Sequence, residues 1–190
     1  MKKNKLEKRI YFLTMYNLSQ IQIGIQSLHA AIEYSLKYGK NKEYQDWAKN
    51  HKTVILLNGG TSNKGHHSEY GESKQLGSME QHFNVLKENK IKCAAFYEPD
   101  LNHSMSAIAF LVDERVFNKK DYPDFSFPKP GDDFIYTFGG KYNLATINNK
   151  MSNYKSLYDK EIKHQEQKYI KEVGKDIAFL KDFLKQFRLA

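Results

Sequence analysis

The chain has 190 residues, of which 40% are hydrophobic and 14% aromatic, and its formal net charge at pH 7 is +8. A fully disordered chain would lack this aromatic content, and the single cysteine, Cys93, excludes an intrachain disulfide and a cysteine-rich zinc site. No apolar run approaches the ~20 residues that cross a bilayer, so we expect no membrane contact. We further expect a folded cytoplasmic protein without a cofactor or a metal ion.

The excess of basic residues is not concentrated in one part of the chain. Only three of the 30 basic residues are arginines, and the remainder are lysines. Each side of a division after Asp113 has 15 basic and 11 acidic residues, an excess of +4. The charge alone is therefore weak evidence for nucleic-acid binding, which usually concentrates basic residues in one patch.

The first predicted elements are a strand and a long helix. Residues 9–16 (RIYFLTMY) are dense in aliphatic and aromatic side chains and predict a buried strand. Ser19 then provides an N-cap, and the predicted helix ends at Gly39. The large apolar residues between them recur at the spacing of a helix that packs one face on a core: Ile21, Ile25, Leu28, Ile32 and Leu36.

Two more helices and three more strands follow. Residues 42–50 predict a short helix, 53–57 a buried strand and 58–77 a long loop rich in Gly, Ser and Asn. Ser78 to Gln81 fit a capping box, which predicts a helix carrying Met79, Phe83 and Leu86. Residues 92–97 and 105–112 predict two strands joined by a turn in which Pro99 and Asn102 carry the bend.

This order, β-α-α-β-α-β-β, predicts an α/β fold with a mixed four-stranded sheet and helices on both faces. We assign it to residues 1–113 as one domain. Residues 114–190 form a predicted extension with a Pro-rich loop at 118–133, a short strand at 134–138 and a helical segment from about residue 153.

The C-terminal helix carries a heptad pattern. Its apolar residues advance by three and four: Ile170, Val173, Ile177, Leu180, Leu184 and Phe187. Two interpretations fit this seam, docking on the chain's own domain or pairing of two subunits in a homodimer. Gly174 weakens such a helix by ~1 kcal/mol.

The first helix and its approach read LSQIQIGIQSLHAA, in which Gln26 precedes the pair His29-Ala30 by three and four residues. With the following EYQDWAKNHKTVIL, a third helix and two final strands, this segment resembles the peptidyl-tRNA hydrolases of the archaeal and eukaryotic type. The resemblance covers residues 9 to about 112. It implies the mixed-sheet fold of that family and hydrolysis of an ester on tRNA or on a related nucleotide-linked substrate.

The resemblance also suggests site residues. The family has a lysine at the head of the first helix and an aspartate in an Asp-Ala-Gly turn, and the matching places here hold Gln22 and the segment Glu98-Pro99-Asp100. The candidate catalytic residues are therefore Glu98, Asp100 and Gln22. Paired carboxylates can split their pKa values so that one acts as a base near neutrality. The candidate substrate-binding residues are Gln26, His29, Asn102, Ser104 and Ser106.

Structural explanations remain open for each group. His29 lies beside Leu28 and fits a partly buried structural histidine, and two acids in an EPD turn are also ordinary solvated residues. The neutral Gln22 favours a second hypothesis, a non-catalytic RNA- or nucleotide-binding module on the same fold. A third hypothesis is an oligomeric interaction protein built on the C-terminal helix.

Overall fold

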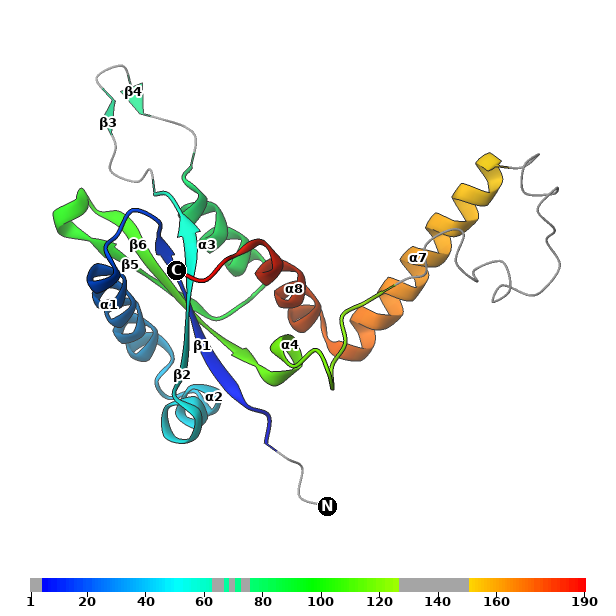
Figure 1. Ribbon diagram of the computed structural model, residues 1–190, viewed down its shortest axis with the longest axis horizontal. Helices are drawn as coiled ribbons and strands as arrows, with labels where there is room; N and C mark the ends of the chain where they lie inside the picture. The colour runs from blue at the N-terminus through cyan, green and yellow to red at the C-terminus, as the bar shows by residue number, and fades with distance from the viewer. Residues whose placement is uncertain (1–4, 63–66, 69–70, 73–75, 127–150) are drawn as a thin grey trace.

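A mixed four-stranded sheet with helices on both faces organises the protein (Figure 1). The computed structural model describes residues 5–62, 67–68, 71–72, 76–126 and 151–190. The sheet order is β2-β1-β6-β5; β1 and β2 are parallel, and β6 is antiparallel to both of its neighbours. The predicted sheet is confirmed, and its strands are β1 (Lys8–Met15), β2 (Thr53–Gly60), β5 (Cys93–Glu98) and β6 (Ser104–Asp113).

Strand β1 lies inside the sheet and contributes to both hydrophobic layers. Its side chains alternate, so Ile10 and Phe12 join one buried cluster while Tyr11 and Leu13 join the other. A strand with apolar residues on both faces is expected where both faces are covered. This burial explains why the β1 sequence is continuously apolar instead of alternating with polar residues.

One face of the sheet is covered by α1 (Gln20–Tyr38), α2 (Lys42–Asp46) and the π-helical turn η1 (Trp47–His51). The predicted N-cap is confirmed, because the Ser19 side chain accepts a hydrogen bond from the Gln22 amide. Helix α1 meets the sheet through small residues and a tyrosine, and the strands beneath it are rich in alanine. The buried cluster on this face consists of Ile10, Phe12, Ala30, Tyr34, Ala94, Ala107 and Ala109.

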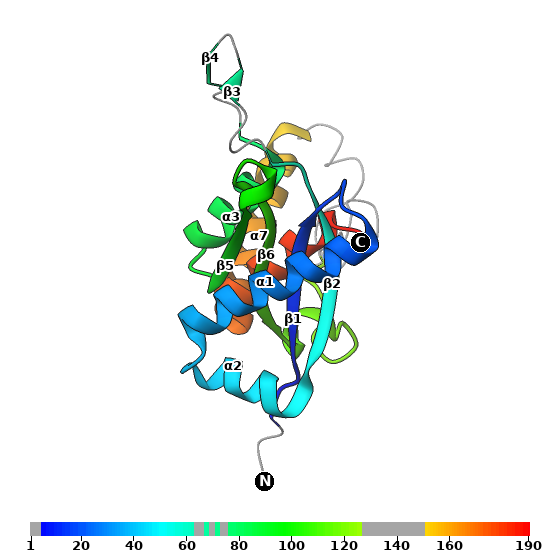
Figure 2. The same ribbon diagram turned by 90° about the vertical axis from the view of Figure 1, so that its left-hand side faces the viewer.

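The large aliphatic residues of α1 do not face this cluster. Ile21 and Leu36 are each 78% exposed and Leu28 is 62% exposed, and Ile25 and Ile32 are also exposed. In Figure 2, α1 lies in front of the sheet. Because these five residues are exposed, they belong to the side of α1 that faces away from the sheet. The expectation that this stripe packs on the core is therefore wrong, because the opposite side of the helix, with Ala30 and Tyr34, makes that contact.

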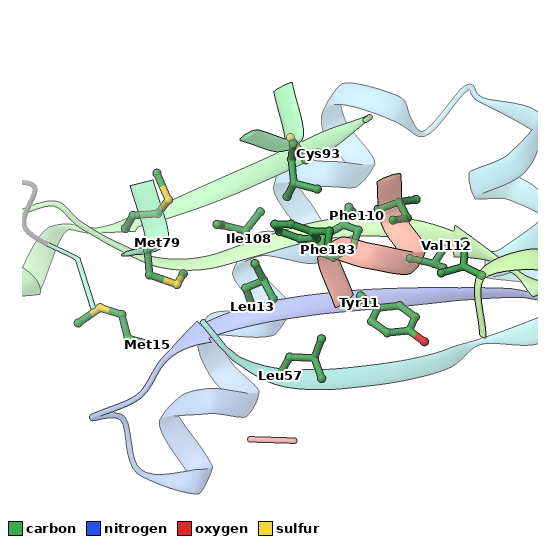
Figure 3. Close-up of a cluster of buried hydrophobic side chains, with 14 of the residues drawn as sticks. Tyr11, Leu13, Met15, Leu57, Met79, Cys93, Ile108, Phe110, Val112 and Phe183 are labelled. Atoms are coloured by element: carbon green, nitrogen blue, oxygen red, sulfur yellow. The ribbon is translucent and has the colours of Figure 1, made fainter. Parts of the chain in front are cut away.

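The other face is covered by α3 (Ser78–Glu88), α4 (Glu114–Phe117) and α8 (Lys175–Phe183). This layer is built from larger side chains than the first. Figure 3 shows Phe183 of α8 against Phe110 and Ile108 of β6, with Leu13 and Met79 nearby. The docking of α8 thus completes the main hydrophobic core.

The C-terminal extension is helical, as predicted, but the single helix expected for the seam is divided at Gly174. Helix α7 (Met151–Val173) ends at Gly174, whose φ of +99° only glycine adopts readily, and α8 starts in a new direction after it. After the short 3-10 turn η3 (Leu184–Gln186), the Asn58 amide donates to the Arg188 carbonyl and the Ala190 amide donates to the Leu56 carbonyl. Residues 188–190 therefore lie along the outer edge of β2, which has no other strand beside it in the described sheet.

The burial of the seam residues decides between docking on the chain's own domain and pairing of two subunits. Ile177 and Leu180 are buried in the main cluster, and Val173, Leu184 and Phe187 pack against it, so docking on the chain's own domain is the interpretation that holds. A coiled-coil homodimer through this helix is not supported, because the apolar surface that it needs is already covered. None of the described helices combines the length and apolar content needed to cross a bilayer.

Two local predictions differ from the structure. Within the predicted long loop, β3 (His67–Ser68) and β4 (Gly71–Glu72) form a small antiparallel ribbon. The capping box at α3 is absent: Gly77 is the N-cap, and the Ser78 hydroxyl instead accepts from the Thr61 amide. The reason is that this hydroxyl also donates to the Gly59 carbonyl at 3.0 Å and so faces the end of β2, while the Gln81 amide donates to the Gly77 carbonyl. The predicted strand at 134–138 lies outside the described residues.

Candidate functional site

The carboxyl ends of three strands lie together along one edge of the sheet, and most candidate residues lie at this edge. Strands β1, β2 and β5 run in the same direction, because β1 and β5 are both antiparallel to β6 and β2 is parallel to β1. Glu98 ends β5 at this edge, opposite Ser104 at the start of β6. Carboxyl ends of parallel strands are the usual place for ligands in open α/β sheets.

A chain of hydrogen bonds joins three candidate residues from three elements. The Nε2 amide of Gln26 on α1 donates to Oε2 of Glu98 at 2.5 Å, and the Ser106 hydroxyl of β6 donates to Oε1 of Gln26 at 2.7 Å. Gln26 is only 6% exposed, so both ends of its amide are satisfied inside the protein. These two bonds fix the orientation of the amide and hold α1 against the ends of β5 and β6.

A β-bulge places Ser106 in this chain. The register changes from Phe96 opposite Ala107 to Tyr97 opposite Met105, which leaves Ser106 as the extra residue of β6. Ser106 then bonds Gln26 on the α1 side, while Met105 belongs to the core on the other face. Without the bulge, strict alternation would place Met105 on the α1 side together with Ala107. Ser106 would then point to the opposite face, away from Gln26.

An aromatic contact lies next to the hydrogen-bonded residues. The His29 ring stacks on Phe96 with a centroid separation of 4.4 Å and an interplanar angle of 15°. His29 follows Gln26 by three residues, so the two side chains lie on neighbouring positions of the helix surface. Both rings are half-buried, and each retains some exposure to solvent. We call Gln26, Glu98, Ser106, His29 and Phe96 the α1–β5 cluster.

The other candidates are not part of this cluster. The Gln22 side chain accepts from the Ser19 amide at 2.9 Å and completes a capping box at the start of α1. Asp100 and Asn102 are exposed in the turn after β5, where the Asp100 amide donates to Glu98 and Asn102 has a φ of +52°. Ser104 is buried and pairs with Glu98 in the strand register.

A buried carboxyl group at the same edge was missed from the sequence. The Ser62 hydroxyl donates to Oε1 of Glu80, and the Met105 amide donates to the Ser62 oxygen at 2.9 Å. Glu80 lies in the first turn of α3, where the helix dipole favours a negative charge. The sequence offers one signal for this contact, a glutamate in the first turn of a predicted helix, but a glutamate at that position is usually exposed to solvent. The contact links α3, the end of β2 and the start of β6.

The chemistry that the α1–β5 cluster offers is polar recognition next to an aromatic ring. Glu98 accepts hydrogen bonds, the Gln26 amide donates one bond and accepts one, and Ser106 donates inward to Gln26. Within the described part of the chain, no group of three or more His, Cys, Asp or Glu side chains is arranged to hold a metal ion. Two surface hollows lie at the opposite end of the sheet, around Lys8 and Glu43, and do not include this cluster.

The histidine on the other face is in a different environment. His82 of α3 contacts Phe187 at 4.8 Å between ring centroids and Phe183 at 5.8 Å, in both cases edge to face. Burial lowers the pKa of His82 below its ordinary value of 6.5. This residue therefore stabilises the docking of α8 and has no part in the α1–β5 cluster.

Comparison with known proteins gives no family for this chain. No model of a known protein family matches the sequence, and no curated protein matches it.

Proposed function

We propose that the protein is a cytoplasmic RNA- or nucleotide-binding module with the architecture expected for the peptidyl-tRNA hydrolase type, which holds the acylated end of a tRNA without cleaving its ester. The observation that carries the proposal is the α1–β5 cluster, in which the chain Ser106–Gln26–Glu98 lies beside the His29–Phe96 stack. The fold order and the position of Gln26 and His29 on α1 agree with the resemblance.

The cluster suits the terminal nucleotide of a tRNA. A half-buried ring that is already stacked on one side provides a platform for a base, and such stacking tolerates any base. The Glu98 carboxylate accepts hydrogen bonds from an exocyclic amine or from a ribose hydroxyl. The cluster thus offers one nucleotide a ring contact from His29 and a polar contact from the neighbouring Glu98 carboxylate.

Binding is favoured over hydrolysis by the way the candidate catalytic groups are used. Ester hydrolysis needs a base for water and a donor for the oxyanion. Gln22 brings no positive charge, and its side chain caps α1. Glu98 accepts from Gln26 and from the Asp100 amide, and the Ser106 hydroxyl donates to Gln26 rather than to a base.

The direct test measures binding and cleavage of the same probe, an N-acetyl-aminoacyl-tRNA labelled at the acyl group. We expect the wild type to bind it in an anisotropy titration and to release no acyl group. The variant His29→Ala should bind about 5- to 150-fold more weakly, since stacking of one base contributes about 1–3 kcal/mol. Glu98→Ala should also weaken binding.

The matched controls are His164→Ala on α7 and Glu88→Ala at the end of α3, both of exposed residues outside the cluster. They should bind as the wild type does. Absence of binding by the wild type, or equal binding by all variants, contradicts the proposal. Acyl release by the wild type that is lost in Glu98→Ala would instead establish the hydrolase hypothesis.

A further inference from the structure

Helix α1 carries a continuous apolar stripe on its outer side. The stripe consists of the exposed residues Ile21, Ile25, Leu28, Ile32 and Leu36. With a rise of 1.5 Å per residue, it extends for about 22 Å along the helix. The described part of the chain leaves this side uncovered, as Figure 2 shows, because α1 is attached to the sheet through its opposite side. Single exposed leucines are ordinary, but an aligned set of five indicates an interaction surface.

Most of the stripe lies in a part of the helix that has no charged residue. From Ser19 to Ile32 the sequence contains no Lys, Arg, Asp or Glu, although 27% of the whole chain is charged. Depletion of charge is typical of the centre of a protein–protein interface. It also removes like-charge repulsion at the contact between two molecules that each have a net charge of +8.

Gly24 lies within the stripe, and the protein's own packing does not require a glycine there. A Cβ added at Gly24 would meet no atom within 4 Å. A glycine inside a helix costs about 1 kcal/mol relative to alanine. Next to Ile21 and Leu28, the missing side chain lets another backbone approach α1 closely. The position is therefore explained by a partner better than by the isolated chain.

Four of the five stripe residues are placed symmetrically, and the fifth, Leu28, lies opposite His29 of the other copy. Ile21 and Leu36 are equally far from the bond between Leu28 and His29, and so are Ile25 and Ile32. Two α1 helices that pack antiparallel about a two-fold axis at this point place each of these four residues opposite an apolar residue of the other copy. Self-complementarity of this kind is what a two-fold symmetric dimer needs.

The flanking charges also fit this arrangement. Glu33 and Gly24 are equally far from the axis, so Glu33 of one copy faces the neutral Gly24 of the other. Lys37 takes no part in the contact, because it lies on the sheet side of α1, where its ammonium donates to the Cys93 carbonyl. A parallel arrangement would instead place Glu33 beside Glu33 of the partner, which is unfavourable.

We propose that the outer face of α1 binds a second copy of this chain in an antiparallel, two-fold symmetric contact. One helix stripe buries less than the roughly 800 Å² per partner of a standard stable interface. The dimer is therefore weak, with a dissociation constant on the order of micromolar, and forms reversibly with concentration.

Sedimentation velocity of the full chain from about 1 to 200 µM tests the contact. The wild-type mass should rise from 22.2 kDa towards twice that value as the concentration increases. Leu28→Glu should stay at the monomer mass over the whole range, with at least a 100-fold weaker association, because a charge would be buried near the axis. Leu28 is exposed in the single chain, so the circular dichroism of Leu28→Glu should match that of the wild type, and so should its unfolding midpoint at submicromolar concentration, where both proteins are monomeric.

The matched control is Val85→Glu, which introduces the same charge on the exposed side of α3. It should dimerise as the wild type does. A wild type that stays at 22.2 kDa throughout, or a Leu28→Glu protein that dimerises equally well, would overturn the proposal. Association that Val85→Glu weakens as much as Leu28→Glu would also overturn it, because the contact would not be specific to α1.

Cysteine pairing tests the orientation. A mixture of Ile21→Cys and Leu36→Cys proteins under mild oxidation should form a disulfide-linked dimer, because these positions face each other across the axis. Neither variant alone should cross-link efficiently, and the buried native Cys93 should not take part. Efficient cross-linking of Ile21→Cys with itself would contradict the antiparallel arrangement.

Discussion

Helices α1 and α8 both carry an apolar stripe, but they use it in opposite ways. Leu28 of α1 is 62% exposed, whereas Leu180 of α8 is 4% exposed. Both stripes have the same periodicity, so the period alone does not determine which side faces the core. The comparison shows that the inner side of a helix is selected by the surface that it covers.

The two faces of the sheet explain the difference. Under α1 the strands present Ala94, Ala107 and Ala109, and a helix side with small residues can approach such a flat surface closely. Under α8 they present Ile108 and Phe110, which accommodate large aliphatic and aromatic side chains. The polar bonds of Gln26 further fix which side of α1 faces inward.

The largest expected difference between the two helices is in stability. Leu180→Ala should lower the free energy of unfolding by about 2–5 kcal/mol, because it leaves a cavity in the main core. Leu28→Ala makes the same chemical change at an exposed position and should stay within about 0.5 kcal/mol of the wild type. Urea unfolding at submicromolar concentration, where the chain is monomeric, measures both. Equal losses in the two variants would contradict the assigned orientations.

A second difference is the ion pair that anchors α8. The Lys181 ammonium is buried, donates to the Tyr122 carbonyl, and lies 3.1 Å from Oδ1 of Asp124. Burial alone would raise the pKa of Asp124, but the hydrogen bonds from Lys181 and Lys119 outweigh it and lower that pKa. Asp124→Ala should cost about 1.5–3 kcal/mol in urea unfolding, since it removes the carboxylate that is paired with a buried cation.

Asp182→Ala is the control for this ion pair. Its partner is Lys185, and both side chains are exposed, so the loss should be below about 1 kcal/mol. If the two aspartate variants are equally stable, the Lys181 contact does not anchor α8.

On α1, a substitution should increase the stability of the single chain. Gly24→Ala should raise the free energy of unfolding by about 0.5–1 kcal/mol, because alanine favours the helix and the added Cβ meets nothing. Gly39→Ala is the contrasting variant and should destabilise, since its Cβ would lie 2.5 Å from the Ser35 carbonyl oxygen. Thermal unfolding at low concentration checks both, and a destabilising Gly24→Ala would show that α1 is already covered.

The smallest expected effect is the pH dependence of α8 docking. Because burial lowers the pKa of His82, the folded protein binds this proton less readily than the unfolded chain. The stabilisation is complete above about pH 6.5, the ordinary value, and decreases as the pH falls below it towards the lowered pKa. His82→Phe should reduce the loss of stability between pH 7.5 and 5.5, whereas His164→Gln, at an exposed position, should not. An identical pH dependence in all three proteins would contradict this role.

The strands and the sheet could be predicted from the sequence because their signals are local. Each strand is an apolar run of suitable length bounded by turn residues, and the turn with Pro99 and Asn102 forms where the sequence places it, with Asn102 in the left-handed region. The start of α1 at Ser19 is equally local, since the capping side chain bonds the amide three residues later. These features depend on neighbours in the sequence.

The features that sequence could not provide depend on distant contacts. The bulge that directs Ser106 towards Gln26 arises from pairing of β5 with β6, and the burial of Glu80 depends on Ser62. The absence of the α3 capping box follows from the bonds of the Ser78 hydroxyl to Gly59 and Thr61. For the site, the sequence grouped eight residues, of which Gln26, His29, Glu98 and Ser106 lie together and Ser104 pairs with Glu98 in the sheet. The other three, Gln22, Asp100 and Asn102, are exposed outside the cluster.

Thiol labelling tests the central claim, that the α1 stripe faces outward and the C-terminal seam faces inward. In Leu28→Cys and Leu180→Cys proteins at submicromolar concentration, Cys93 serves as an internal reference, since burial raises its pKa to about 11 and slows its reaction. We predict that the thiol at position 28 reacts at nearly the rate of the unfolded protein, and that the thiol at position 180 reacts at least ~100-fold more slowly, because it is exposed only by unfolding. Protection at position 28, or rapid reaction at position 180 in a folded protein, would contradict the account.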